Sequence, residues 1–256
     1  MYTSKFRKLE KAFINLPNLL YGYNIYVNKN KFKLIDRAFN NLSSEPKTFA
    51  DMGGVWKVNA AYTFYTLKKH NIKQGFLIDT NSNEVTDKKS KQYPNLKCIN
   101  ANFTDKETVE KIGKVDVIFF FDVLLHQVKP DWNEVLKDYS KITDCIVIYN
   151  QQYINSEDTI RLTALPLEEY KNIAPKRDDD VYDYIYSHKN DLNTEYNKNW
   201  GDIHNIWQWG ITDNNLRETL AELDFREVFY KNYGRFSQLK HFEDHGFVFI
   251  KNHLVD

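Results

Sequence analysis

The segment around residue 51 combines a carboxylate with a double glycine, a pattern suited to a small cationic ligand. An apolar run from Thr48 to Met52 contains Asp51 and is followed by Gly53 and Gly54. A strand that ends in a glycine turn lets a ligand approach the backbone closely. Because the acid repels phosphate and no G-x-G-x-x-G pattern is present, a cationic amine fits better than a dinucleotide. An ordinary glycine turn of an α/β domain is the alternative.

The elements that would position this turn alternate regularly. Apolar runs after the first predict strands, and helical spacing separates them. The strands are expected over 75–79, 96–100, 115–122 and 145–150, and the helices over 55–69, 84–93, 105–113 and 131–142. This alternation predicts a parallel sheet with right-handed crossovers, and a continuous run such as VIFFF fits a central strand covered on both faces.

Polar residues follow three further strands of the predicted sheet. Ligands of an open parallel sheet bind outside the carboxyl ends of its strands. Asp79 and Thr80 end the second strand, where a carboxylate can accept hydrogen bonds from both ribose hydroxyls. Asn102 and Phe103 follow the third, where an amide and a backbone N–H can read an adenine edge, and Asp122 ends the fourth. Helix capping or turn chemistry is the alternative for each one alone.

Together these features resemble the class I S-adenosylmethionine-dependent methyltransferases over roughly residues 46–150. The first motif of that family, D/E-x-G-x-G-x-G, matches Asp51 and Gly53, whereas Val55 and Lys57 replace its second and third glycines. FFFDVLLHQV looks like the family's segment after strand four. The resemblance implies S-adenosylmethionine as cofactor, held by Asp51, Gly53, Gly54, Asp79, Thr80, Asn102, Phe103, Asp122 and Val123.

The resemblance also implies the fold class, an α/β, Rossmann-like, seven-stranded and mainly parallel sheet with helices on both faces. Its last two strands are expected over 225–232 and 245–252, the final one antiparallel. Four parts are predicted: an N-terminal helical lid (1–45) with helices over 3–16 and 31–42, the cofactor-binding core (46–150), a substrate cap inserted after strand five (151–212), and a C-terminal helix with the last two strands (213–256).

Two histidines are candidates for catalysis. His204 lies in DIHNIWQWG, with Asp202 as a possible orienting carboxylate and Trp207 and Trp209 as pocket walls, so we favour it slightly as the general base. His126 follows the fourth strand and is assigned a cofactor or substrate contact. A structural, hydrogen-bonded histidine is the alternative for both. The predicted substrate-binding residues are Asn150, Gln151, Gln152, Trp207, Trp209 and Arg235.

Three later segments carry a second resemblance. NQQY (150–153), DIHNIWQWGIT (202–212) and the NYGRF run (232–245) look like a bacterial group of uncharacterised methyltransferases, some in surface-polysaccharide gene clusters. This implies O-methylation of a small acceptor, a sugar- or phosphate/phosphoramidate-containing precursor of a surface polysaccharide. A non-catalytic S-adenosylmethionine-binding protein and an NAD-dependent oxidoreductase are the alternatives.

Composition restricts the partners and the location. Lys and Arg total 35 and so do Asp and Glu, so neither a nucleic acid nor a membrane surface is expected as a partner. The two cysteines exclude a disulfide framework in practice, and with no long apolar run we expect a cytoplasmic protein, with a homodimer left open. HFEDH (241–245) lacks the order of a zinc-binding helix, so no metal is expected.

Overall fold

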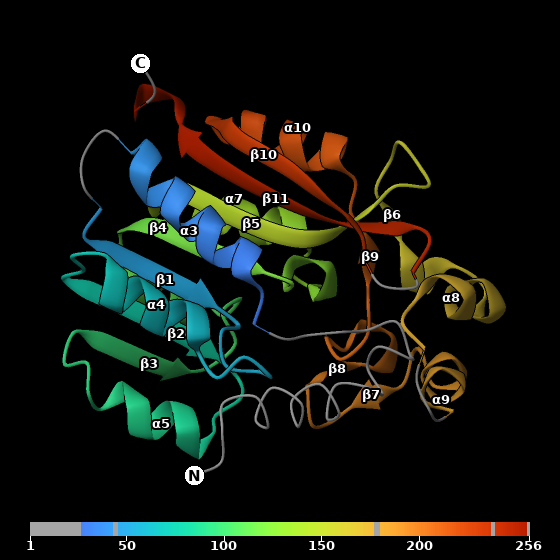
Figure 1. Ribbon diagram of the computed structural model, residues 1–256. Helices are drawn as coiled ribbons and strands as arrows, with labels where there is room; N and C mark the ends of the chain where they lie inside the picture. Colours follow the sequence, from blue (N-terminus) through green and yellow to red (C-terminus); the bar gives the residue numbers. More distant parts are fainter. Residues whose placement is uncertain (1–26, 43–45, 177–179, 237–238, 255–256) are drawn as a thin grey trace, which may run out of the picture.

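The computed structural model describes residues 27–42, 46–176, 180–236 and 239–254, so the helix expected over 3–16 lies outside the described residues. One seven-stranded sheet organises the chain, in the order β10-β11-β5-β4-β1-β2-β3 (Figure 1). Its strands are β1 (Thr48–Met52), β2 (Gln74–Asp79), β3 (Leu96–Asn100), β4 (Val115–Phe121), β5 (Thr143–Tyr153), β10 (Phe225–Arg235) and β11 (Phe242–Lys251). Strand β11 runs antiparallel to the other six strands of this sheet. The predicted fold class is therefore confirmed.

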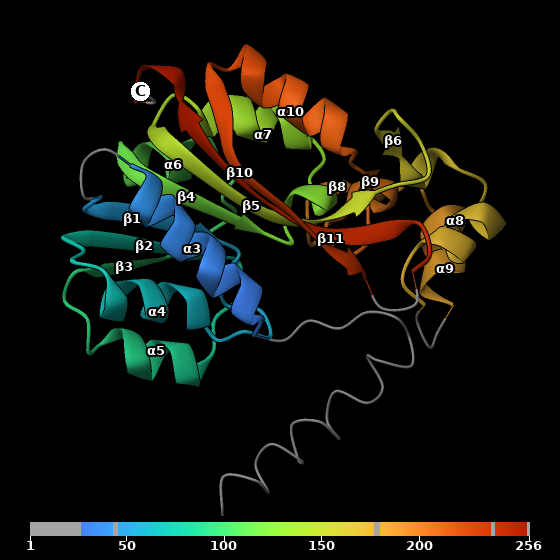
Figure 2. The same ribbon diagram turned by 45° about the horizontal axis from the view of Figure 1, so that its top comes forward.

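Helices cover both faces of the sheet, as Figure 2 shows. One layer consists of α3 (Lys29–Asn41), α4 (Ala61–Lys69) and α5 (Glu84–Ser90). The opposite layer consists of α6 (Lys106–Ile112), α7 (Trp132–Tyr139) and α10 (Asp213–Glu222), the last capped by the side chain of Thr212. Alternate residues along each central strand point to opposite layers, which is why these strands are apolar throughout.

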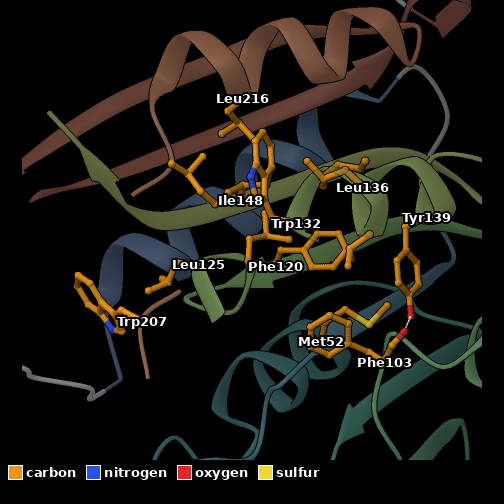
Figure 3. Packing of buried hydrophobic residues seen from close by; sticks show 14 of the residues in the cluster. Met52, Phe103, Phe120, Leu125, Trp132, Leu136, Tyr139, Ile148, Trp207 and Leu216 are labelled. Carbon is orange, nitrogen blue, oxygen red and sulfur yellow. Dashed lines mark hydrogen bonds between the residues drawn. The ribbon is translucent and has the colours of Figure 1, made fainter. Parts of the chain in front are cut away.

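The larger core lies between the sheet and α7 with α10. Trp132 and Leu136 of α7 and Leu216 of α10 pack on Phe120 and Ile148 of the sheet (Figure 3). Each fully buried side chain of this size stabilises the fold by about 1.5–3 kcal/mol. In the same layer the hydroxyl of Tyr139 donates a 2.5 Å hydrogen bond to the carbonyl of Phe103, which fixes the loop after β3 beside the core.

Helix α3 is amphipathic, and its buried face includes a charged residue. Its buried residues are Lys31, Leu34, Ile35, Ala38 and Phe39, which recur at helical spacing on one face. That face packs on β5 and β11, so α3 belongs to a core layer. Of the predicted 1–45 lid, the structure describes residues 27–42, which consist of α3 and the few residues that flank it. Because Lys31 lies on this apolar face, its side chain is buried in the interior.

A compact insertion follows β5 and lies at the carboxyl ends of the parallel strands (Figure 1). Strand β5 continues to Tyr153, three residues beyond its predicted end, because its last residues pair with β11. The insertion contains β6 (Ile160–Arg161), η2 (Leu162–Ala164), α8 (Leu167–Ile173), α9 (Val181–Ser187), β7 (Leu192–Asn193), β8 (Lys198–Asn199), η3 (Trp200–Asp202) and β9 (Trp209–Gly210). We call residues 154–212 the cap.

The helix expected over 55–69 begins only at Ala61. Between the glycine turn and α4, the residues Lys57, Asn59 and Ala60 have φ values of 56°, 49° and 55°. A left-handed backbone is incompatible with a right-handed helix and costs free energy in residues with a side chain. The segment between the glycine turn and α4 is therefore a longer, strained loop at the carboxyl end of β1.

Two short 3-10 helices complete the described fold, η1 (Leu124–His126) after β4 and η4 (Asn252–Leu254) after β11. Among the helices of the described ranges, none combines the length and the apolar character needed to cross a bilayer.

Candidate functional site

A cavity of about 1420 Å³ lies between the carboxyl ends of the strands and the cap. Most of the residues predicted for the site line it, although they come from five separate segments. These are Asp51, Gly53, Gly54, Asp79, Thr80, Asn102, Phe103, Asp122, Val123, His126, His204 and Trp207.

Both glycines of the turn are required by close packing. Gly53 has a φ of 72°, and a Cβ there would lie 2.6 Å from Cγ1 of Val123, so the end of β4 reaches the backbone of the turn. At Gly54 a Cβ would lie 2.6 Å from Oδ2 of Asp51. Contacts this short are repulsive, so any side chain at either position displaces the turn or the acid.

Asp51 is a buried carboxylate with one unsatisfied oxygen. The hydroxyl of Thr63 donates to its Oδ2 at 2.6 Å, while Oδ1 has no hydrogen-bond partner among the described residues. Burial raises the pKa of Asp51 to about 6, against the opposing hydrogen bond from Thr63. A buried acceptor left unpaired is costly, and a cationic N–H donor is the group that relieves this cost best.

Asp79 fastens the strained loop. Its Oδ2 accepts hydrogen bonds from the backbone N–H groups of Val55 at 2.8 Å and Trp56 at 3.2 Å, and its Oδ1 accepts from the backbone of Asn81 at 2.8 Å. The residue that replaces the motif's second glycine is thus held by the acid at the end of β2. The side-chain amide of Asn81 also donates to Oδ1 at 3.0 Å, so all four lone pairs of the carboxylate are engaged, and a ribose hydroxyl would have to replace one of these donors.

Asn102 and Phe103 form the wall after β3. The side-chain oxygen of Asn102 accepts from the backbone N–H of Thr104 at 3.0 Å, which orients the amide. The Phe103 ring packs edge-on against Phe120 at 6.2 Å between centroids. These contacts make the wall a fixed surface of the cavity.

Lys31, to which the sequence analysis assigned no role, also lines the cavity. Its ammonium forms an ion pair with Oδ2 of Asp122 and lies over the rings of Tyr62, Phe121 and Tyr149, at 5.4, 5.7 and 4.9 Å from their centroids. Burial opposes the charge, but Asp122 outweighs it, so the pKa of Lys31 is raised. The lysine therefore stays protonated beside the glycine turn.

Gln151 links this ion pair to a further acid. Its Nε2 donates to Oδ1 of Asp122 at 2.8 Å and to Oδ1 of Asp244 at 2.9 Å. Burial, with the charge of Asp122 adding to it, raises the pKa of Asp244 to about 6. Asn150 donates to Oε1 of Gln152 at 2.9 Å. These three amides are buried and do not line the cavity, so the structure does not bring them together with the predicted site residues that do.

Two other predicted substrate residues also lie outside the cavity lining. The indole N–H of Trp209 donates to the carbonyl of Gln127 at 2.7 Å, and the guanidinium of Arg161 lies 5.0 Å above its ring. Trp209 therefore fixes β9 against the core. Arg235 is exposed at the end of β10. Neither side chain therefore joins the predicted residues that line the cavity.

His126 is oriented by the cap. The carbonyl of Ile206 lies 2.9 Å from its Nδ1, and since a carbonyl only accepts, Nδ1 carries the proton. The neutral ring then carries its lone pair on Nε2. His126 lines the cavity and joins the segment after β4 to the cap at the same time.

His204 has the properties of a neutral base at the cavity wall. Burial lowers its pKa, and the positive charge of Lys198 lowers it further, while Asp79 and Glu195 oppose both effects. Its ring meets that of Tyr196 edge-on at 5.0 Å. Within the described ranges, no hydrogen bond orients it.

The proposed orienting carboxylate of His204 is engaged elsewhere. Asp202 accepts from Nζ of Lys129 at 2.7 Å and from a guanidinium nitrogen of Arg161 at 3.1 Å. Asp202 therefore does not hydrogen-bond to His204, because the one residue between them is enough to turn their side chains apart in an irregular segment. No group of three or more histidine, cysteine or acidic residues suited to a metal ion is found among the residues that the structure describes.

The sequence matches no protein-family model and no curated protein. Solved structures do match. The 1,6-didemethyltoxoflavin-N1-methyltransferase of Burkholderia thailandensis, with bound 1,6-didemethyltoxoflavin and S-adenosylhomocysteine, is 10% identical with a TM-score of 0.55, over 88% of this chain and 78% of that one. The N-terminal domain of EvdMO1, in the presence of S-adenosylhomocysteine and D-fucose, is 11% identical with a TM-score of 0.54, over 90% and 85%.

A third similar structure is the cyclopropane synthase MmaA2 of Mycobacterium tuberculosis, at 12% identity and a TM-score of 0.52, over 86% of this chain and 84% of that one. Identities this low establish the architecture alone. The fold is therefore that of the S-adenosylmethionine-dependent methyltransferases, as the residues between 46 and 150 predicted.

Proposed function

We propose that this chain is a methyltransferase that uses S-adenosylmethionine to methylate a hydroxyl of a small, sugar-derived acceptor. The observation that carries the proposal is Asp51, a buried acid with an unpaired oxygen beside two sterically required glycines. The α-ammonium group of S-adenosylmethionine supplies the missing donor. An NAD molecule offers a pyrophosphate to this turn, which the acid repels.

The electrostatics of the site suit this cofactor. The ammonium of Lys31 is paired with the carboxylate of Asp122, and it also lowers the pKa of both Asp51 and Asp244. The region thus carries an excess of negative charge. S-adenosylmethionine carries two cationic groups and one carboxylate, so its net charge complements the site.

The cavity has room for two molecules. Ligand pockets usually measure about 300–1,000 Å³, and this cavity of about 1420 Å³ exceeds that range. The residues at the strand ends would hold the cofactor, and the cap would enclose an acceptor over it. When bound, S-adenosylmethionine supplies an electrophilic methyl group. The chain contributes alignment and water exclusion, which can account for about 7–11 kcal/mol of the barrier.

His204 is our choice for the general base. Its lowered pKa keeps the imidazole neutral at pH 7, and a neutral imidazole can accept the proton of an acceptor hydroxyl. D-fucose accompanies EvdMO1, one of the similar structures, which supports a sugar as the acceptor scaffold. The resemblance of the segments after residue 150 supports a surface-polysaccharide precursor as its source.

Calorimetric titration with S-adenosylhomocysteine, S-adenosylmethionine and NAD tests the cofactor. We expect micromolar binding of the first two and none of NAD. Transfer of a labelled methyl group to a panel of sugars and sugar phosphates then tests the activity. Tight cofactor binding without transfer to any acceptor would favour a non-catalytic binding protein, and no binding of either cofactor form at millimolar concentration would refute the proposal.

A substitution of His204 tests the base. His204→Gln should lower kcat by about 100- to 10,000-fold with little change in cofactor affinity, because general-base catalysis contributes an effect of this size. His188, which stacks on Tyr184 outside the cavity lining, provides a matched control, and His188→Gln should leave kcat unchanged. Equal kcat values for both variants would remove His204 from the chemistry.

A further inference from the structure

Apart from the residues assigned to the cofactor, the cavity lining is rich in lysine. Among the described residues, this remaining lining includes only two acids, Asp105 and Glu195. The lysines come from the strained loop, the start of α6, the turn before α7 and the cap, and they are Lys57, Lys106, Lys129, Lys176 and Lys198. Lysines from four separate segments converge on one space, which points to a ligand that carries negative charge.

Lys198 differs from the other four in its surroundings. It lies on β8, it is half-buried, and its Nζ donates to the backbone carbonyl of Val128 at 2.7 Å. Within the described ranges no carboxylate comes within ion-pair distance of it, whereas its neighbour Lys129 is paired with Asp202 at 2.7 Å. Burial lowers the pKa of Lys198, and the more distant charges of Asp202, Asp105 and Asp131 offset this effect only in part.

A single carbonyl satisfies only one of the three N–H donors of an ammonium group. A purely structural lysine that fastens β8 to the loop after η1 would need no charge there, and its desolvation would cost stability. An anion in the cavity would both satisfy the remaining donors and pair the charge. His204 lies beside the β7–β8 hairpin that carries Lys198, since its ring packs on that of Tyr196 at 5.0 Å and both His204 and Lys198 line the cavity.

We propose that Lys198 is the anchor for an anionic group of the acceptor, a phosphate or a carboxylate, held next to the hydroxyl that His204 faces. The inference rests on the proposed methyl transfer and adds the substrate class to it. The acceptor is then a small, negatively charged hydroxyl compound, and a neutral sugar is a poor substrate. Lys106 and Lys176 add long-range attraction at the rim, where they are exposed.

Binding measurements on the cofactor-loaded protein test this assignment without knowledge of the true acceptor. The protein is saturated with S-adenosylhomocysteine and titrated with glucose 1-phosphate, glucuronate, inorganic phosphate and glucose. We expect at least one of the two charged sugars to bind at least tenfold more tightly than glucose. The stronger of the two identifies the anion as phosphate or carboxylate, and inorganic phosphate reports how much of the affinity the anion alone supplies.

Three variants separate an anchor from a structural lysine. Lys198→Met should weaken binding of the preferred sugar by about ten- to a hundredfold, the range expected for a lost charge-assisted hydrogen bond. Lys198→Arg should retain most of the affinity, because it keeps the charge and donors to the carbonyl of Val128. Lys111→Met, an exposed position on α6 outside the cavity lining, is the control and should leave the affinity unchanged.

The two proposals fail in different ways. If S-adenosylhomocysteine does not bind, the methyltransferase proposal falls. If it binds to wild type and to Lys198→Met with equal affinity, but charged sugars bind no better than glucose, only the anionic acceptor is overturned. Equal binding of the preferred sugar to wild type and to Lys198→Met would likewise refute the anchor.

Discussion

Replacing the carboxylate of Asp51 by an amide is the most direct test of the cofactor site. Asp51→Asn keeps the shape of the side chain and an oxygen for the hydroxyl of Thr63, which now donates to Oδ2 at 2.6 Å. It removes the charge that the ammonium group of the cofactor would pair with. A hydrogen bond to a charged group contributes about 1.5–3 kcal/mol, so the dissociation constant for S-adenosylhomocysteine should rise roughly ten- to a hundredfold at pH 7.5.

Thermal unfolding with ligand translates this into a measurable shift. A ligand at 100 times its dissociation constant stabilises the native state by about 2.7 kcal/mol. If the variant binds thirtyfold more weakly, the same ligand concentration stabilises it by only about 0.9 kcal/mol. For a chain of this size the ligand-induced rise in Tm should fall from roughly 5–11 °C to roughly 2–4 °C.

The pH dependence gives a second readout of the same group. The native state keeps the proton of Asp51 up to about pH 6, against a reference pKa of 3.8, so the native state binds more protons than the unfolded state between these values. Stability of the ligand-free protein should therefore fall as pH rises from about 4 to about 6, by up to about 3 kcal/mol from this residue. Ligand affinity should rise over the same range, because the ionised acid binds the amine.

Both pH effects should be smaller in Asp51→Asn, and the difference between the two profiles isolates Asp51 from Asp244, which titrates near the same pH. Asp116→Asn serves as the control, since that acid holds the start of β1 through the backbone N–H of Thr48 at 2.8 Å. It should lower stability and leave ligand affinity unchanged. Equal ligand affinity of wild type and Asp51→Asn at pH 7.5 would refute the reasoning.

Two further substitutions test the packing against Asp51 and the ion pair between Lys31 and Asp122. Gly54→Ala should destabilise the fold by about 1–3 kcal/mol in urea denaturation, because its Cβ would lie 2.6 Å from Oδ2 of Asp51, and an unchanged midpoint would contradict the packing argument. Lys31→Met, which leaves Asp122 buried without its cation, should cost about 3–5 kcal/mol of unfolding free energy. A loss below about 1 kcal/mol would mean that the ion pair is not formed in solution.

The order of elements and the residues at the strand ends were accessible from the sequence. Local periodicity fixes which segments are strands and helices, and parallel strands place their carboxyl ends at one edge, so Asp51, Asp79 and Asn102 were found without a structure. Helix starts were less accessible. The left-handed residues before α4, such as Lys57, have no side-chain signature that separates them from a helix.

The assignments beyond residue 150 depended on long-range pairing. Gln151 lies on β5, whose partner β11 follows only after the cap, α10 and β10, and this pairing decides whether its side chain enters a cavity or the interior. Lys31 had a local signal, a lysine on the apolar stripe of α3, but its partner is 91 residues away. The position of Lys31 on the apolar face of α3 predicts that it is buried, but it does not predict which acid it pairs with.

The sequence by itself determined the glycine turn after β1 and the α/β architecture that carries it, because both arise from short-range patterns and backbone geometry. Only the tertiary structure decided which charges share the interior. The meeting of Lys31 with Asp122, and of Lys198 with the wall that holds His204, joins segments that are far apart along the chain. Electrostatic interactions depend on distance and on burial, and both quantities are set by the packing of the whole chain.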